Sequence, residues 1–296
     1  MSANTASRFR TVRWRTVFFV LALTNVPTAG WATPLLGSNL AGFAVLAATA
    51  VSNTGATTID GNVGVSPSAS ITGSEAITLS GSYHTGSDPM GTAAQIEIAT
   101  AITLLSSLDQ GTTLLADLTG LVVFPGVYTV PAGVTNLTGT LTLDGNGNTN
   151  AAWVFLMTST LITSPGAFVD VINTGAGAGI YWRVASSATL DTTTVFSGNI
   201  LAWESITLNH AATIACGRAL AHTGAVTMDN NTVGASNCMN TIGEGTNGFS
   251  GGLDVVGATV NFLPFAEIPE PGSLVLVSAG FGLLSVSRRR RAKSGA

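Results

Sequence analysis

Hydrophobic and polar positions between residues 179 and 231 follow a repeated pattern of short strands. The phrases "GNILA" and "GRALA" start at Gly198 and Gly217, and each is followed by a polar turn and a second apolar run, "SITL" or "AVTM". An earlier copy, "GIYWRVASSATLD", starts at Gly179, so the three glycines are evenly spaced. Runs rich in Ile, Val, Leu and Thr, separated by turn residues, are typical of strands. A period of about 19 residues predicts stacked coils of a parallel β-helix.

Weaker copies of the pattern extend this prediction over most of the chain. They are "TLTLDGNGNTNAAWVFLMTSTLITSP" and, nearer the start, "ATAVSNTGATTIDGNVGVSP". The L-x-x-L-x-L phrase of leucine-rich repeats and the six-residue rhythm of left-handed β-helices are missing. The predicted fold is therefore mainly β, with a β-helix domain over residues 33–240.

One segment has the periodicity of an α-helix. Asp88 is placed as an N-cap, Pro89 stands at the first helical position, and Gly111 is placed to end the segment. Apolar residues recur at 94, 98, 101, 102, 105 and 108. The pattern predicts an amphipathic helix over about residues 89–109, packed along one flank of the β-helix. Residues 241–268 begin with a Gly-rich stretch, which indicates a linker and tail.

Residues 1–32 have the three parts of a secretory signal peptide. Basic residues precede a short apolar stretch, and Gly30 and Ala32 are placed for cleavage by signal peptidase. The mature, exported protein is therefore predicted to begin near Thr33.

Residues 269–296 also form a tripartite segment. Pro269, Glu270 and Pro271 precede about thirteen mostly apolar residues, and a cluster of arginines follows at 288–291. This tail resembles the PEP-CTERM sorting signal of Gram-negative bacteria. The resemblance implies recognition by an exosortase, transient membrane anchoring and a location at the cell surface or outside the cell. A plain C-terminal transmembrane anchor would give the same outward-facing location.

Charge is distributed unevenly along the chain. Nine of the eleven basic residues lie near the two ends, whereas all fifteen acidic residues lie between Asp60 and Glu270. Only Arg183 and Arg218 are basic in the body, whose net charge of −13 argues against nucleic-acid binding. Cys216 and Cys238 are too few for a zinc site, and in an exported chain they form either one disulfide or two buried thiols.

The sequence offers no arrangement typical of catalysis, cofactor binding or metal binding. The acidic residues are scattered singly, and Asp170, Asp191 and Asp229 fall near turns, where Asp commonly bonds its own backbone. His84, His210 and His222 have no Cys, Asp or Glu at metal-ligand spacing. The chain is therefore predicted not to be an enzyme.

Hydroxyl-bearing residues align instead. The phrases "SSAT", "ESIT" and "GAVT" place Thr189, Thr207 and Thr227 one above another in successive coils. Alternation along a strand places Ser187, Ser205 and Ala225 on the same outward face. Such a ladder is a flat grid of hydroxyl and methyl groups, although threonine also favours strands for purely structural reasons.

Several phrases in order resemble the DUF3494 type of ice-binding protein. They include "GFAVLAATAVSNTGATTIDGNVGVSP", "FPGVY", "AAWVFLMTSTLIT" and the repeat ending in "GAVTMDNN", and together they cover Leu36 to Asn231. The resemblance implies a right-handed, discontinuous β-helix with one long helix beside it. It also implies that ice and ordered water are the partners of one flat face, with no catalysis and no cofactor.

Several members of that family carry T-A/G-x-T/N on the binding face, and "TAVS" from Thr49 comes close to this motif. Glu204 departs from it and would interrupt the face if its side chain pointed outward in that plane. Two alternatives on the same fold are a surface or matrix adhesion protein and a carbohydrate-active enzyme. The predicted ice-binding residues are Thr49, Ser187, Thr189, Ser205, Thr207 and Thr227.

Overall fold

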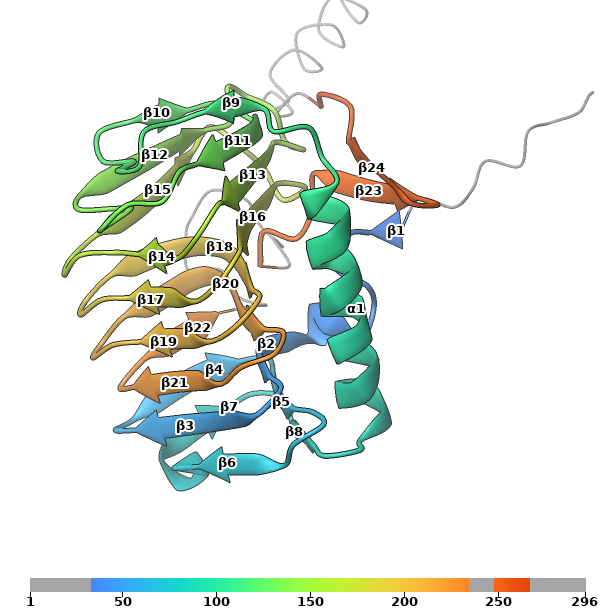
Figure 1. Cartoon of the computed structure of the whole chain (residues 1–296), viewed down its shortest axis with the longest axis vertical. Coiled ribbons are helices and arrows are strands. Elements are labelled where there is room, and N and C mark those ends of the chain that lie inside the picture. Colours follow the sequence, from blue (N-terminus) through green and yellow to red (C-terminus); the bar gives the residue numbers. More distant parts are fainter. Residues whose placement is uncertain (1–32, 235–247, 267–296) are drawn as a thin grey trace, which may run out of the picture. The chain divides into compact units, whose positions relative to one another are not determined.

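The computed structural model describes residues 33–234 and 248–266, and nearly all of its strands run parallel to one another in stacked coils (Figure 1). Each full coil passes through three faces separated by corners. Apolar side chains from all three faces meet inside the stack, where Phe155, Trp182 and Phe196 pack ring against ring. This interior is the larger of two buried apolar clusters. The β-helix prediction is therefore confirmed.

The first face is a six-stranded parallel sheet, which we call the serine/threonine face. Its strands are short because each coil soon turns again at a corner. In spatial order they are β14 (Leu161–Ile162), β17 (Ala188–Leu190), β19 (Ile206–Leu208), β21 (Val226–Asp229), β3 (Ala50–Thr54) and β6 (Ser70–Thr72).

The second face lies under the helix, and we call it the helix-covered face. Helix α1 (Pro89–Ser106) buries Ala94, Ile98 and Leu105 against outward-pointing apolar side chains of this face. Its strands are β9 (Thr112–Thr113), β11 (Gly126–Val130), β13 (Ala152–Met157), β16 (Gly179–Val184), the second halves of β18 (Val195–Ala202) and β20 (Thr213–Ala221), then β2 (Phe43–Ala47), β5 (Asn62–Val65) and β8 (Tyr83–Thr85).

The third face is not covered by α1, and we call it the second open face. The first halves of β18 and β20 belong to it, since both strands bend at a glycine to cross the corner. Its other strands are β10 (Val122–Val123), β12 (Thr140–Asp144), β15 (Phe168–Ile172), β22 (Thr232–Gly234), β4 (Thr57–Asp60) and β7 (Ile77–Leu79).

The coils do not stack in sequence order. Strands β2, β3 and β4, from the start of the body, pair with β20, β21 and β22 from its end. Helix α1 then runs along the stack and carries the chain to β9 at the far end (Figure 1). The discontinuity expected from the resemblance is therefore present.

One corner of the stack holds a column of residues with positive φ. It joins the serine/threonine face to the second open face, and backbone hydrogen bonds link its turns from coil to coil. At this corner Asn231 is buried, and its side-chain amide donates to the carbonyl oxygens of Asn209 and Ala212 at 2.8 and 2.9 Å. The positive-φ residues of the column are Gly166, Thr193, Ala211, Asn230, Gly55 and Gly73.

The spacing of coils is less regular than the sequence repeat indicated. The number of residues between paired positions in successive coils varies. Thr189 and its partner Thr207 are separated by far fewer residues than Phe155 and its partner Trp182. Gly198 and Gly217 lie in register, whereas Gly179 does not join their column. Gly179 instead lies against the segment that starts at residue 248. A side chain at residue 179 would overlap the carbonyl oxygen of Gly251 in that segment.

Two further predictions need correction. Helix α1 ends at Ser106 rather than at residue 109, because Ser107 closes it with bonds to the last carbonyl groups. Within the segment predicted as a linker, β23 (Leu253–Val256) and β24 (Thr259–Phe262) form an antiparallel hairpin that pairs with β1 (Thr33–Pro34). Leu253 and Val260 of this hairpin are buried in the cluster beneath α1, so the segment belongs to the folded body.

Candidate functional site

A column of hydroxyl-bearing residues crosses the serine/threonine face in five successive coils. Thr189 pairs with Thr207, and Thr207 pairs with Thr227, so the predicted alignment of these threonines is present. The column continues through Ser52, which pairs in register with Thr227, and through Thr72, which pairs with Ser52. All five side chains are exposed or half-buried. On β17, β19 and β21 the neighbours on either side of each threonine point into the core.

A second column of small residues lies two positions earlier along the same strands. Backbone bonds from Ala188 to Ser205 and from Ile206 to Ala225 place Ser187, Ser205 and Ala225 side by side, as alternation predicted. Ala50 and Ser70 pair with each other in the next two coils. Together the two columns, which we call the hydroxyl grid, present short hydroxyl and methyl groups.

Part of the hydroxyl grid was missed by the sequence analysis. Thr49, which the T-A/G-x-T/N motif indicated, is exposed at the corner just before β3, and its backbone N–H donates to the carbonyl oxygen of Gly224. Val51 points into the core, so Ala50 and Ser52 are residues of β3 that face outward. The apolar character of Val51 is the signal that could have placed Ser52 in the column.

Glu204 lies at the edge of the hydroxyl grid. The residue is exposed, and its carboxylate accepts hydrogen bonds from the hydroxyl groups of Ser186 and Ser187 in the neighbouring coil, at 3.1 and 3.2 Å. Glu204 therefore points along the corner toward neighbouring serines. The Ser187 hydroxyl also accepts from the backbone N–H of Ser205, which fixes its orientation.

The second open face carries a threonine ladder of its own, which was not predicted from the sequence. Thr213 pairs with Thr232, Thr232 with Thr58, and Thr58 with Thr78. Beyond Thr213 the ladder ends, because Val195 and the partly exposed Phe168 take the next two positions. The residues two positions further along include Asp60, so this face combines threonine with a carboxylate and an aromatic ring.

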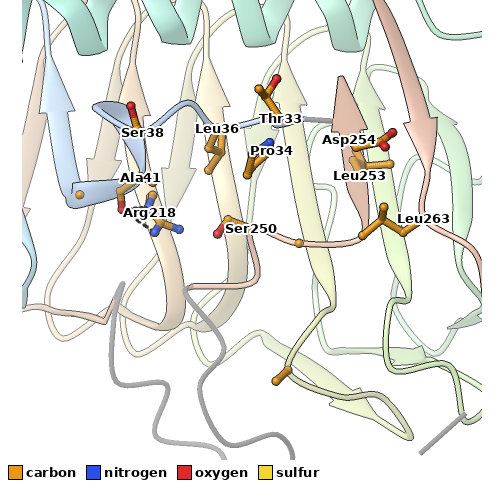
Figure 2. Close-up of a pocket in the computed structure, with 13 residues that line it drawn as sticks. Thr33, Pro34, Leu36, Ser38, Ala41, Arg218, Ser250, Leu253, Asp254 and Leu263 are labelled. Carbon is orange, nitrogen blue, oxygen red and sulfur yellow. Dashed lines mark hydrogen bonds between the residues drawn. The ribbon is translucent and has the colours of Figure 1, made fainter. Parts of the chain in front are cut away.

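A cavity of about 660 Å³ lies beside β1 and the hairpin, away from the hydroxyl grid (Figure 2). Arg218 borders it, and its buried guanidinium donates to the carbonyl oxygens of Ala41 and Gly248 and to the side chain of Asn199. Burial lowers the pKa of Arg218 to about 10. These bonds fasten three separate segments, which is a structural role.

Two histidines lie beside an aspartate. His84 lies 3.0 Å from Asp88 at the start of α1, and His210 lies 3.2 Å from Asp229 at the corner. Within residues 33–234 and 248–266, no three His, Cys, Asp or Glu side chains are grouped so that they could hold a metal ion.

Cys216 is buried and disulfide-bonded. Cys238 lies outside the described residues, as do the signal peptide and the sorting motif Pro269, Glu270 and Pro271. No helix in the described part of the chain is long and apolar enough to cross a membrane.

Comparison with known proteins identifies relatives over most of the chain. Residues 45–234 match the family model described as ice-binding-like. The ice-binding protein of Nostoc sp. (strain HG1) is 39% identical over 255 residues, which is 86% of each chain. A crystal structure of an ice-binding protein from an Antarctic biological consortium superimposes with a TM-score of 0.63 at 38% identity, covering 68% of this chain and 90% of that one.

A second solved structure has a similar likeness. The ice-binding protein of the Antarctic ascomycete Antarctomyces psychrotrophicus has a TM-score of 0.64 and 34% identity, over 70% of this chain and 99% of that one. Sequence and fold agree over the same stacked coils that carry the hydroxyl grid. The chain therefore belongs to the ice-binding-like family.

Proposed function

We propose that this chain is an exported protein that binds ice through the hydroxyl grid of the serine/threonine face and so inhibits ice growth or recrystallisation. The observation that carries the proposal is the register of Thr189, Thr207 and Thr227 with Ser52 and Thr72 across five coils. Ser187 and Ser205 extend the same surface. Thr49 borders it at the corner.

The spacing of the grid suits an ordered layer of water. Neighbouring strands lie about 4.8 Å apart, and outward residues along one strand are separated by about 6.7 Å. Threonine methyl groups restrict the water around them, while hydroxyl groups hold individual water molecules by hydrogen bonds. Water that is ordered before contact adds little ordering cost when the face meets the ice lattice.

The corner residues keep the grid rigid. The amide of Asn231 bonds two carbonyl groups of one turn in the preceding coil, and Asn209 donates to the carboxylate of Asp191 at 2.9 Å. Each coil is therefore fixed to its neighbour at the edge of the serine/threonine face. Long charged side chains would disturb ordered water, and Glu204, a charged group at the rim, is bonded to two serines.

The serine/threonine face is favoured over the second open face for two reasons. Its threonine and serine column spans five coils, whereas the ladder on the second open face spans four and ends at Val195. The second open face then presents the partly exposed ring of Phe168, which carries no hydroxyl group.

Adhesion to a surface or matrix is the second candidate, favoured by the outward location that the C-terminal tail predicts. One test distinguishes ice binding from adhesion. The purified protein is cooled beside a single ice crystal, and crystal shape and the gap between freezing and melting temperatures are recorded. Thr207→Tyr is compared with Thr232→Tyr, which places the same bulky ring on the second open face.

Ice binding through the hydroxyl grid predicts crystal shaping and a gap that Thr207→Tyr reduces strongly and Thr232→Tyr leaves nearly unchanged. An equal reduction of the gap in both variants would show that the hydroxyl grid is not the ice-binding site. No shaping by the unmodified protein at high concentration would eliminate ice binding and leave adhesion to be tested.

A further inference from the structure

Asp254 of β23 carries a buried carboxylate oxygen with no hydrogen-bond partner. This atom, Oδ1, has essentially no solvent exposure. A buried carboxylate oxygen without a donor is costly, because nothing replaces the water bonds that it loses on folding. The opposite residue on β1 cannot help from its backbone, because Pro34 has no N–H group.

The charged groups nearby are engaged elsewhere. Arg218 borders the same cavity, where its guanidinium donates to the carbonyl oxygen of Ala41 (Figure 2). The guanidinium also donates to the side chain of Asn199. On the other side of β1, the carboxylate of Glu97 accepts from Leu40 N at 2.7 Å and from the Asn39 side chain at 2.7 Å. The phenol of Tyr181 donates to the carbonyl oxygen of Gly251 at the edge of this cavity.

Thr33 is the residue that could supply a new donor. It lies in register with Val255, next to Asp254, and its hydroxyl is 3.4 Å from the Val255 carbonyl oxygen. Thr33, Pro34 and Asp254 border one cavity (Figure 2). The sequence independently predicts that the mature chain begins near Thr33, and cleavage of the peptide bond after Ala32 makes Thr33 its first residue. Hydrolysis of that peptide bond consumes one water, leaves a carboxylate on Ala32 and gives Thr33 an ammonium group with three protons in place of one.

We propose that the α-ammonium group of the cleaved chain binds the Asp254 carboxylate, so that removal of the leader completes the pairing of β1 with β23. The site is an amine-binding site for the chain's own new N-terminus. Leu35 and Leu36, which follow β1, are buried with Leu253 in the cluster under α1, so the bond fastens the start of the body to that cluster. This inference holds whether or not the protein binds ice.

The α-amine can be observed selectively, because Lys293 is the only lysine in the sequence. Reductive methylation with ¹³C-formaldehyde therefore labels the α-amine and that single side chain, and NMR gives the pKa of each. In protein beginning at Thr33, the pKa of the α-amine is expected about one unit above its ordinary range of about 7.7–8.0, because the carboxylate stabilises the charged form. Asp254→Asn should return it to that range.

Two controls separate the possible causes. Glu97→Gln removes the other nearby carboxylate and should leave the raised pKa in place. A form that retains Ala32 as its first residue moves the amine by one position without altering Asp254, and it should show the ordinary value even if Asp254→Asn fails to fold. An α-amine pKa that is the same in all four proteins, or an exported protein whose N-terminal sequence starts elsewhere, would overturn the proposal.

Discussion

Gly217 of β20 lies in register beside Gly198 of β18, and a side chain on Gly217 would overlap the Gly198 carbonyl group. Both glycines have positive φ, 146° at Gly217 and 109° at Gly198, where the strands turn from the second open face to the helix-covered face. The repeated glycine of the sequence therefore has two causes at one corner, a backbone conformation and a close approach of two chain segments.

Gly217→Ala should destabilise the protein through both causes. A side chain at positive φ alone costs about 1–2 kcal/mol, and overlap with the neighbouring backbone should bring the total above about 3 kcal/mol. Gly147→Ala is the matched control, since Gly147 has φ of 80° but no atom within 4 Å of the place that a Cβ would take. Urea unfolding measures both variants, and equal losses would show that close approach is unimportant.

Asn231→Ala should loosen the corner that borders the hydroxyl grid. The substitution leaves the carbonyl groups of Asn209 and Ala212 without their donor. At about 1–3 kcal/mol for each unsatisfied group, a loss of about 2–6 kcal/mol in the free energy of unfolding is expected. The freezing-point gap should fall with it.

Asn230→Gly is the control for this corner, because glycine readily adopts the positive φ of 55° found there. It should leave both stability and the gap nearly unchanged. If Asn231→Ala loses stability but keeps its full gap, rigidity of the corner is not needed for ice binding.

Glu204→Gln tests whether the charge at the rim interrupts the grid. The amide oxygen can still accept from Ser186 and Ser187, so the local geometry is kept while the charge is removed. Because Glu204 points along the corner, the freezing-point gap should change less than twofold, far less than in Thr207→Tyr. A large gain on substitution would mean that the carboxylate disturbs the ordered water of the face.

The buried phenol of Tyr181 should cause the free energy of unfolding to fall at alkaline pH. Burial raises the pKa of its phenol above the ordinary value of 10.0, and the hydroxyl donates to Gly251 at 2.8 Å. A folded pKa above the unfolded one contributes stability that is fully present below the unfolded pKa and is lost as the pH rises beyond it. Urea unfolding at pH 9 and pH 11 should therefore show a decline that Tyr181→Phe reduces.

Spectrophotometric titration checks the same claim directly. In the folded protein, one of the three tyrosines should remain un-ionised at a pH above its ordinary pKa. The Tyr181→Phe variant should lack this un-ionised tyrosine at the same pH. Full ionisation of all three at the ordinary value, with the fold intact, would contradict the burial of this phenol.

Cys216 should be joined to Cys238, the only other cysteine of the chain. Peptide mapping without reductant should yield one linked pair, and a thiol reagent should detect no free thiol in the oxidised protein. Closure of this loop is expected to contribute about 2–4 kcal/mol, which Cys238→Ser would remove. A free thiol at Cys216 in the folded, unreduced protein would disprove the pairing.

The sequence by itself determined the parts of the fold that repeat locally. Thr189, Thr207 and Thr227 could be aligned because their phrases are near copies, and copies in a stacked coil fold take equivalent positions. Helix α1 was predictable from Asp88, Pro89 and the spacing of its apolar residues, because capping and amphipathicity are short-range properties. The absence of lysine from the body also required only the sequence.

Tertiary structure alone decided how the two ends of the body meet. Ser52 and Thr72 join the column of Thr227, and Thr58 joins that of Thr232, because β3 and β4 stack on β21 and β22 from the opposite end of the body. Parallel strands bond backbone to backbone, so no side-chain pattern records which distant strand is the partner. Which side chains of β3 face outward was also decided there. Val51 is buried when β3 pairs with β21, and alternation along the strand then turns Ser52 outward.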